Sequence, residues 1–394
     1  MNAPASKGFS AALSTDRDWR RAVRTVAAKA RKDLGEGCDL ALVFVSEIYA
    51  GLEPEQLCAE LGEALPSRLL LGCNSSGVIM GSREVELEPA VSLMAMRLPG
   101  VAVRPLRFSS EQSHAAEGGP RLLENLDVYP SDAPKFILLA DPMGCDVERL
   151  VKALNESYPG SPMVGGLASG LAVGRPNWLV LDGQVCRQGA VGAALCGDVE
   201  LDIAVAQGCR PIGSPLIITK AQAHILLELG GRPAVEVLKE LLGSLPVRDQ
   251  ALARHSLFGG LVMNEYRDRF GRGDFLVRNI IGYDAQSGAL MIGTQLRPGQ
   301  TFQFQLRDAE TSSDDLRALL GRIGKVDRGE KGALLFSCCG RGRGLYGKPD
   351  HDSGLVQKMH GPLALAGFFA NGEIGPVGER NYIHGYTSSL AILR

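Results

Sequence analysis

A six-residue glycine motif occurs three times, and this internal repeat constrains the fold more than any other feature of the chain. Each copy has Gly, two variable residues, a small residue, Ser or Asn, and a second Gly. The copies are residues 72–77 (GCNSSG), 165–170 (GGLASG) and 367–372 (GFFANG). An apolar segment begins roughly 30 residues before each copy, which is the length of a βαβ unit. The spacing therefore predicts three related units.

The segments around each motif predict the same order of elements three times. An apolar strand (41–45, 136–140, 333–336) is followed by a helical stretch, a short strand that enters the motif, and a later strand (90–98, 190–196, 387–393). Pro54 suits a first helical turn, whereas Asp146 and Asp352 suit helix N-caps. We expect an α/β fold of three strand-helix-strand-loop-strand units that form mixed sheets with helices outside.

Two segments fall outside the repeat. Residues 1–37 predict an N-terminal helix that begins near Thr15, with Asp18 as its capping-box partner. Residues 257–262, 275–281, 289–294 and 301–306 alternate in hydropathy and predict an antiparallel β-meander. Helices are expected at 221–229 and 234–242. The Gly-Gly-Arg-Pro break between them suggests domains at 1–37, 38–231 and 232–394.

Composition excludes several classes of protein. Hydrophobic residues make up 45% of the chain, charged residues 22%, and the formal net charge is -2, which favours an ordinary globular protein without affinity for nucleic acid or membranes. The apolar runs are too short to span a bilayer and no secretory signal is present, so a cytoplasmic location is expected. The nine cysteines contain no C-x-x-C pair, so neither a disulfide framework nor a metal site is predicted.

The sequence resembles the FIST (F-box and intracellular signal transduction) family from about Cys38 to the C-terminus. The N-terminal half carries the resemblance at 72–79 (GCNSSGVI) and 206–213 (AQGCRPIG). The C-terminal half carries it at 273–279 (GDFLVRN), 305–309 (QLRDA), 336–343 (FSCCGRGR), 349–352 (PDHD) and 366–377. These motifs identify the chain as resembling a stand-alone bacterial member with FIST N-terminal and C-terminal domains.

The resemblance implies sensory input to intracellular signalling. Family domains occur beside kinase, cyclase or chemotaxis modules and are thought to bind small ligands such as amino acids, while some stand-alone members resemble haem-based gas sensors. No output module is recognised in this sequence, so the resemblance implies a separate effector such as a kinase or cyclase.

Candidate ligand-binding residues lie in the glycine motifs, the meander and the C-terminal loops. Arg341 and Arg343 stand in a glycine-rich loop whose natural guest is a carboxylate or phosphate, although both could instead pair with Asp350 and Asp352. A thiolate at Cys73 or Cys338 could be reactive, and His384 could be a ligand. The candidates are Cys73, Asn74, Ser75, Ser76, Arg278, Arg307, Cys338, Arg341, Arg343, Asp352, Glu373 and His384.

The leading hypothesis is a sensor that encloses an anionic metabolite, such as an amino acid, between the glycine loops and the meander. A haem gas sensor is the first alternative, because haem needs only one axial His or Cys and an apolar slot. A thiol-dependent enzyme and an interaction scaffold are further alternatives. No complete catalytic constellation is found, so no enzymatic activity is expected. The glycines could instead be close-packing residues, an alternative that is stronger for the second motif than for the first and third, whose neighbours are more polar.

Overall fold

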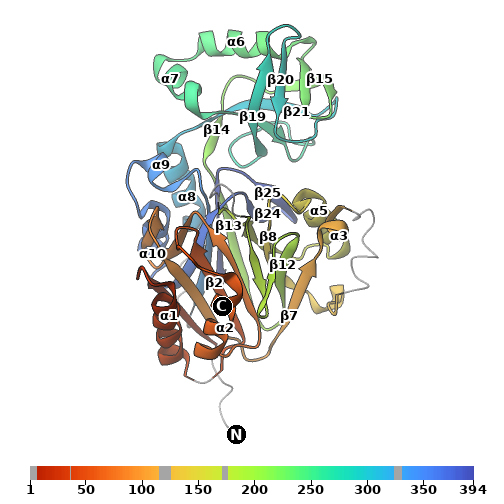
Figure 1. Cartoon of the computed structure of the whole chain (residues 1–394). Coiled ribbons are helices and arrows are strands. Elements are labelled where there is room, and N and C mark those ends of the chain that lie inside the picture. Colours follow the sequence, from red (N-terminus) through yellow and green to blue (C-terminus); the bar gives the residue numbers. More distant parts are fainter. Residues whose placement is uncertain (1–6, 36, 115–125, 171–175, 324–330) are drawn as a thin grey trace. The chain divides into compact units, whose positions relative to one another are not determined.

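The computed structural model describes residues 7–35, 37–114, 126–170, 176–323 and 331–394 (Figure 1). The chain divides into two compact units. The larger unit comprises Met1–Val205, Arg317–Ile383 and Thr387–Arg394, and the smaller unit comprises Ala206–Leu316 and His384–Tyr386. Among the described residues, no helix is long and apolar enough to cross a membrane.

The larger unit confirms the threefold repeat. Each repeat places two parallel strands side by side with a helix between them in sequence, and its last strand pairs antiparallel with its first. The first repeat has β2 (Leu40–Ser46), α2 (Pro54–Ala64), β3 (Leu70–Ser75) and β6 (Val91–Arg97). The second has β8 (Lys135–Ala140), α5 (Val147–Ser157), β9 (Met163–Leu167) and β12 (Ala190–Gly197). The third has β22 (Gly332–Cys338), α10 (His351–His360), β23 (Ala364–Ala370) and β26 (Thr387–Leu393).

The three repeats exchange strands in a cycle. The strand that follows each glycine motif leaves its own repeat and joins the sheet of another. β4 (Gly77–Met80) of the first repeat pairs with β23 of the third, β24 (Glu373–Val377) of the third pairs with β9 of the second, and β10 (Leu179–Leu181) of the second pairs with β3 of the first. This exchange ties the three mixed sheets together.

Further strands complete three sheets of six strands each. The first sheet has the order β1-β6-β2-β3-β10-β11, the second β25-β24-β9-β8-β12-β7, and the third β13-β26-β22-β23-β4-β5. The remaining bounds are β1 (Gly8–Ser14), β5 (Arg83–Glu86), β7 (Val101–Phe108), β11 (Gln184–Cys186), β13 (Leu201–Gln207), β25 (Arg380–His384), α3 (Ser110–His114), α9 (Gly342–Tyr346) and the 3-10 turn Pro130–Asp132.

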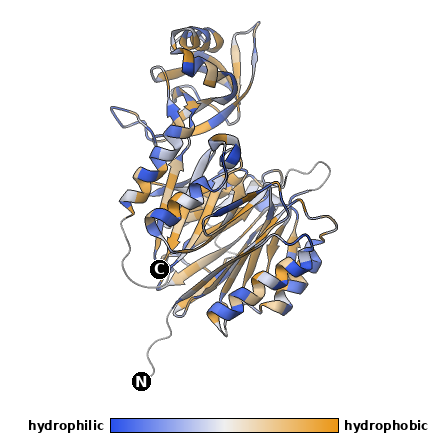
Figure 2. Cartoon of the chain, turned by 90° about the vertical axis from the view of Figure 1, so that its left-hand side faces the viewer, coloured by the Kyte–Doolittle hydropathy of each residue, from blue (hydrophilic) through white to orange (hydrophobic). Residues whose placement is uncertain are grey.

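One apolar core lies among the three sheets, and helices cover their outer faces. The rings of Phe44, Phe336 and Phe368, from β2, β22 and β23, meet with centroids 4.9–6.2 Å apart. The apolar sides of α1 (Trp19–Leu34) and α2 cover the first sheet, and α5 covers the second. Figure 2 shows hydrophobic strands and hydrophilic outer helix faces. Burial of these two-sided strands is the main source of stability.

The first glycine of each motif is required by close backbone approach. A Cβ atom at Gly72, Gly165 or Gly367 would lie 2.5, 1.8 or 1.8 Å from the carbonyl oxygen of Val43, Leu138 or Leu335 on the parallel neighbour strand. Real Cβ atoms do not approach carbonyl oxygens so closely. The close-packing interpretation therefore holds for this position in all three copies.

The N-terminal segment differs from the prediction. A strand, β1, precedes α1 and pairs with β6, so residues 1–37 do not form a helix alone. α1 begins at Trp19 rather than near Thr15, because Asp18 is its N-cap and accepts the backbone N–H groups of Arg20 and Arg21. The short alternating run 8–14 is a strand at the edge of a sheet, and that pairing depends on residues about 80 positions away.

The smaller unit contains the predicted meander and closes it into a barrel. β18 (Leu257–Val262), β19 (Phe275–Asp284) and β20 (Ala289–Ile292) are antiparallel neighbours, and β21 (Thr301–Arg307) pairs with β18. β15 (Leu216–Gln222) and β16 (Ile225–Leu229) bridge β21 and β20, which completes the closure. The other elements are β14 (Cys209–Pro211), β17 (Arg232–Pro233), α6 (Ala234–Ser244), α7 (Val247–Ser256) and α8 (Ala309–Arg322).

The predicted helix at 221–229 is wrong. These residues end β15, turn, and form β16. A short apolar run such as 225–229 fits a buried strand as well as a helix, and pairing of β16 with β15 and β20 decides the outcome. The helix predicted at 234–242 is confirmed as α6. Asp146 also caps α5 as expected, accepting the N–H of Arg149.

Replacement of Gly367 by Ala is expected to destabilise the protein by at least about 2 kcal/mol, because the new Cβ atom forces β22 and β23 apart. Gly62 of α2 is the control, since nothing lies within 4 Å of a Cβ atom there and Ala in a helix interior stabilises by about 0.5–1 kcal/mol. Urea unfolding measures both changes. Equal stability of the two variants would contradict the close-approach argument.

Candidate functional site

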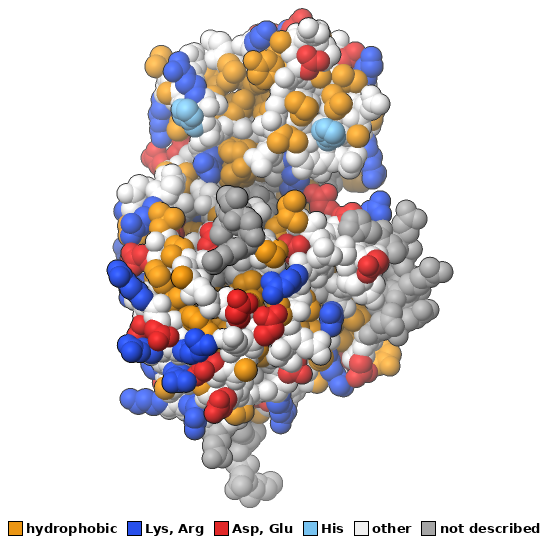
Figure 3. Space-filling view, in the orientation of Figure 1, with side chains coloured by type: hydrophobic (Ala, Val, Ile, Leu, Met, Phe, Trp, Pro, Cys, Tyr) orange, Lys and Arg blue, Asp and Glu red, His pale blue; other side chains and the backbone are white. Residues whose placement is uncertain are grey.

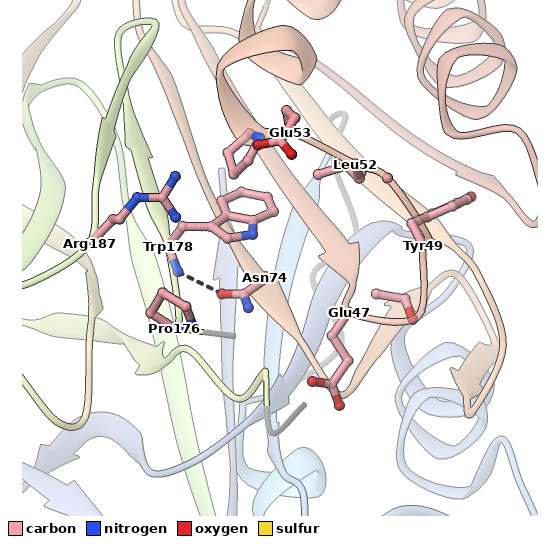
Figure 4. A pocket seen from close by; sticks show the side chains of 11 residues that line it. Glu47, Tyr49, Leu52, Glu53, Asn74, Pro176, Trp178 and Arg187 are labelled. Carbon is pink, nitrogen blue, oxygen red and sulfur yellow. Dashed lines mark hydrogen bonds between the residues drawn. The ribbon is translucent and has the colours of Figure 1, made fainter. Parts of the chain in front are cut away.

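A pocket of about 230 Å³ lies in the first repeat, at the carboxyl ends of β2 and β3 and the beginning of α2 (Figure 4). Ser46 ends β2, Asn74 lies near the end of β3, and Pro54 begins α2. Ligands of α/β proteins commonly bind at this end of parallel strands. The lining residues are Ser46, Glu47, Tyr49, Gly51, Leu52, Glu53, Pro54, Asn74, Pro176, Trp178 and Arg187.

Asn74 presents an unused hydrogen-bond donor to the pocket. Its side chain is 5% exposed, and its Oδ1 accepts the backbone N–H of Trp178 at 2.9 Å. That bond requires an oxygen, so the amide nitrogen Nδ2 occupies the other position. Nδ2 has no hydrogen-bond partner among the described residues. A donor without a protein partner at the wall of a pocket can bind an acceptor group, so Asn74 is suited to hold such a group of a ligand.

The second glycine motif makes room for this amide. A Cβ atom at Gly170 would lie 2.0 Å from Nδ2 of Asn74. Any larger residue would displace the amide from its position beside Trp178. The first and second repeats therefore jointly position the donor.

The rest of the pocket combines an aromatic wall with charges of both signs. Trp178 is 7% exposed, and Figure 4 shows its indole between Arg187 and the residues of the α2 side. Glu47 and Glu53 carry negative charge. Arg187 is half-exposed, and its one ion pair with a described residue is a 3.3 Å contact with Glu55 at the surface. Such an exposed pair is weak, so the guanidinium can turn to a ligand.

The three glycine motifs meet through hydrogen bonds. The backbone N–H of Ser76 donates to Oγ of Ser169 at 3.0 Å, and Oγ of Ser169 donates to the carbonyl of Phe369. The N–H of Leu167 donates to the carbonyl of Gly372 at 2.9 Å. The three motifs therefore lie close together, as predicted. Ser76 contributes one of the hydrogen bonds that join them.

Two predicted ligand residues of the first motif face away from the pocket. Oγ of Ser75 donates to the carbonyl of Gly77 at 2.9 Å. Cys73 is fully buried in the core among the three sheets, where burial raises the pKa of its thiol well above the ordinary value. A reactive thiolate at Cys73 is therefore disfavoured, and a ligand in the pocket contacts Asn74 rather than these neighbours.

Arg341 and Asp352 form a buried ion pair in the third repeat. Arg341 is 0% exposed and binds both carboxylate oxygens of Asp352, at 2.6 and 3.1 Å. Tyr346 and Ser337 also donate to Asp352. Burial alone would raise the pKa of Asp352, but Arg341 outweighs it and holds the pKa below its ordinary value. Of the two interpretations of Arg341, ligand binding or pairing with an aspartate of its own loop region, the structure shows the pairing.

Asp352 therefore does not cap α10 as expected. The N-cap is Asp350, in a left-handed conformation, and Asp352 lies in the first turn. Arg343 shows no ion pair with Asp350. Its exposed backbone N–H instead donates to Oε1 of Glu86 at 3.0 Å.

Glu373 is fully buried at the start of β24. Its Oε2 accepts the N–H and Oγ1–H of Thr387, at 3.1 and 2.6 Å. Oε1 has no hydrogen-bond partner among the described atoms. Burial raises the pKa of Glu373 well above its ordinary value. Cys338 is 7% exposed, and its Sγ accepts the N–H of Gly340.

The remaining candidates lie in the smaller unit. Arg278 donates to the carbonyl of Val277, and the guanidinium of Arg307 lies over the rings of Phe258 and Tyr386 at 5.8 and 5.1 Å. His384 is 2% exposed. The predicted ligand residues are thus distributed over several places, and only Asn74 lines the described pocket.

Sequence reasoning missed most of this pocket. Tyr49, Glu47, Glu53 and Pro54 come from the loop 46–54, and Trp178 and Arg187 come from the second repeat. One signal was available, because a loop that joins a buried strand to a helix in a βαβ unit is where ligands bind.

The pocket does not fit haem: no His, Cys or Met is among its described lining residues, and the phenol of Tyr49, the remaining type of axial ligand, donates to the carbonyl of Asp16. His351 is occupied otherwise, with its ring stacked on Tyr346 at 3.6 Å and its Nδ1 3.0 Å from Asp352.

The fold is a three-repeat α/β unit with a ligand-sized pocket, combined with a small β-barrel. The chain belongs to the FIST family, since it matches the FIST N domain over residues 39–232 and the FIST C domain over residues 234–376. FIST domains are associated with sensing in signal transduction.

Proteins of similar sequence occur in mycobacteria. A protein of Mycobacterium tuberculosis strain H37Rv, described as uncharacterised, is 37% identical over 381 residues, which cover 96% of this chain and 98% of that protein. A Mycobacterium bovis protein with the same description is 35% identical over 382 residues, covering 96% and 97%. Among solved structures, cyanuric acid hydrolase from A. caulinodans aligns over 98% of this chain and 99% of its own, with 8% identity and a TM-score of 0.35. That weak likeness carries no conclusion about activity.

Replacement of Asp352 by Ala is expected to cost about 3–5 kcal/mol, because it leaves the charge of Arg341 buried without its partner. The control is Asp198→Ala, which removes an exposed ion pair with Lys7 and should cost less than about 1 kcal/mol. Chemical unfolding compares the two. Similar small losses would show that the Arg341 cluster is not structural.

Replacement of Glu84 by Gln is expected to flatten the dependence of stability on pH. Glu84 accepts the N–H groups of Ser353 and His351 in the first turn of α10, at 2.8 and 3.3 Å. Burial, followed by the charge of Asp352, raises the pKa of Glu84 to about 7. The stability that its proton provides is complete below the ordinary pKa near 4.5 and is lost as the pH rises through 7.

Urea unfolding of the wild type and Glu84→Gln at pH 5 and pH 8 tests this. The wild type should lose on the order of 1–3 kcal/mol more than the variant between these pH values. Equal losses would refute the assignment.

Proposed function

We propose that this protein is a sensor that binds a small anionic or zwitterionic metabolite, such as an amino acid, beside Asn74 and Trp178. It passes the signal to a separate cytoplasmic effector such as a kinase or cyclase. The observation that carries the proposal is the unpartnered Nδ2 of Asn74, a residue that is 5% exposed and lines a pocket of about 230 Å³. Membership of the FIST family supports the sensory role.

The charges of the pocket complement an amino acid. A carboxylate would accept from Nδ2 of Asn74 and from Arg187, near the positive end of α2, whose N-cap Glu53 makes no side-chain cap. An ammonium group would lie toward Glu47 or Glu53. The side chain of the ligand would contact Trp178, Leu52 and Pro176. The small volume favours a metabolite below the size of typical drug-like ligands.

The same residues argue against chemistry in the pocket. Burial raises the pKa of Tyr49 far above its ordinary value, so its phenol is a poor general base near neutral pH. Of the residues that the structure describes, no cysteine or histidine lines the pocket. We therefore propose binding without turnover.

The test is a thermal-shift screen of the standard amino acids and small organic acids at millimolar concentration. A ligand of the folded state raises the melting temperature by mass action. Tryptophan fluorescence locates the ligand, because the chain has only two tryptophans and Trp19→Phe leaves Trp178 as the single reporter. No shift with any compound, together with unchanged Trp178 emission, would refute the proposal.

Asn74→Leu is expected to weaken binding of the ligand found in that screen by at least about tenfold, because a hydrogen bond to a charged group is worth about 1.5–3 kcal/mol. Arg187→Gln should weaken it as well. Arg104→Gln, an exposed change on β7, is the control and should leave affinity unchanged. Fluorescence titration measures all three, and undiminished affinity in Asn74→Leu would place the ligand elsewhere.

A further inference from the structure

The outer face of α1 is strongly basic. Six of its sixteen residues are Arg or Lys and one is acidic, although the whole chain has a net charge of -2. Lys and Arg side chains gather over α1, toward the lower left of Figure 3. Arg24 lies three and four residues after Arg21 and Arg20, on the same side of α1, and Arg17 lies directly before the N-cap Asp18. We call these four residues the arginine stripe.

The position of the stripe opposes helix stability. Arg20 and Arg21 lie in the first turn of α1, which contains no acidic residue, although the positive end of a helix disfavours cations. The side chains of Arg21 and Arg24 are 73% and 66% exposed. Contacts with neighbouring residues offset part of this unfavourable charge. Arg20 donates through Nη2 to Gln56 and lies over the Trp19 ring, Arg21 pairs with Asp18 and Arg24 pairs with Glu60. Departures from a local rule at exposed positions are typical of functional surfaces.

We propose that the arginine stripe is a docking surface for an acidic, Asp- and Glu-rich segment of a partner protein. Guanidinium groups bind carboxylates in paired hydrogen bonds. Two acidic residues of α2 lie beside α1: Glu60 pairs with Arg24, and Glu63 is near the same guanidinium. A long polyanion or a flat anionic bilayer would meet these carboxylates, whereas a short acidic segment fits the stripe alone.

The stripe is connected to the pocket by two hydrogen-bonded links. Tyr49 lines the pocket, and its phenol donates to the carbonyl of Asp16 at 2.7 Å. Asp16 directly precedes Arg17 of the stripe in the sequence. Pro54 lines the pocket at the start of α2, and Gln56 of the same turn accepts from Arg20 at 2.6 Å. A ligand that shifts either wall therefore shifts the stripe. This coupling rests on the proposed sensor function, whereas docking itself does not.

Fluorescence polarisation with a labelled Glu/Asp-rich peptide tests docking on the full chain without any ligand. Arg17→Glu/Arg21→Glu should weaken peptide binding by at least about tenfold, and added salt should weaken the wild type. The matched control is Arg104→Glu/Arg107→Glu on β7, which makes the same charge change at exposed positions and should preserve binding. Circular dichroism melts confirm that both variants fold.

Equal losses in the two double variants would overturn the proposal, because binding would then follow net charge alone. Tighter binding of phosphatidylserine vesicles or of a single-stranded oligonucleotide than of the peptide, at one ionic strength, would also overturn it.

The coupling has its own test. Tyr49→Phe should bind the peptide normally, but an amino acid that binds the pocket should change peptide affinity less than it does in the wild type, because only the link through Gln56 and Arg20 is left. An unchanged response in Tyr49→Phe would overturn the Tyr49 link and leave docking intact.

Discussion

The close approach of parallel strands at the glycine motifs is the constraint on which the rest of the larger unit depends. At Gly72, Gly165 and Gly367 the neighbouring carbonyl occupies the space of a Cβ atom. Because the strands can approach there, the following residues of each motif turn away from their own sheet and enter the next. The cyclic exchange of β4, β10 and β24 follows from these turns, and it brings the motifs into hydrogen-bonding contact.

The three repeats place equivalent positions at the ends of their first strands, but only the first repeat has a described pocket of ligand size there. In the second, Asp141 is 5% exposed and accepts the N–H of Gly144 at 2.7 Å. In the third, the guanidinium of Arg341 fills the corresponding region with Asp352 and Tyr346. The loop after the first strand of the third repeat therefore holds a buried ion pair, whereas the loop after the first strand of the first repeat borders a pocket.

The repeated units and the strands of the meander could be predicted because their signals are local, namely apolar periodicity, cap residues such as Asp146 and the glycine spacing. The pairing of β1, the strand exchange and the closure of the barrel could not, because they depend on contacts between distant segments. The pocket illustrates the difference. Asn74 was identified from its motif, but Trp178 and Arg187 reach it only through the exchanged strand β10 and the turn after β11. Likewise, sequence spacing left open whether Arg341 binds a ligand or Asp352, and burial of both side chains decides it.

Asn74 connects the pocket to this architecture. Its Oδ1 holds the N–H of Trp178 at the edge of β10, which belongs to the second repeat, while its Nδ2 faces the pocket of the first. An acceptor bound to Nδ2 polarises the amide and strengthens the bond from Oδ1 to Trp178, because linked hydrogen bonds reinforce one another. A ligand bound to Nδ2 would therefore stabilise the exchanged strand β10 through the amide group of Asn74. Sensing requires such a differential effect on two arrangements of the protein, and the exchanged strand is the element whose position a ligand in this pocket would influence.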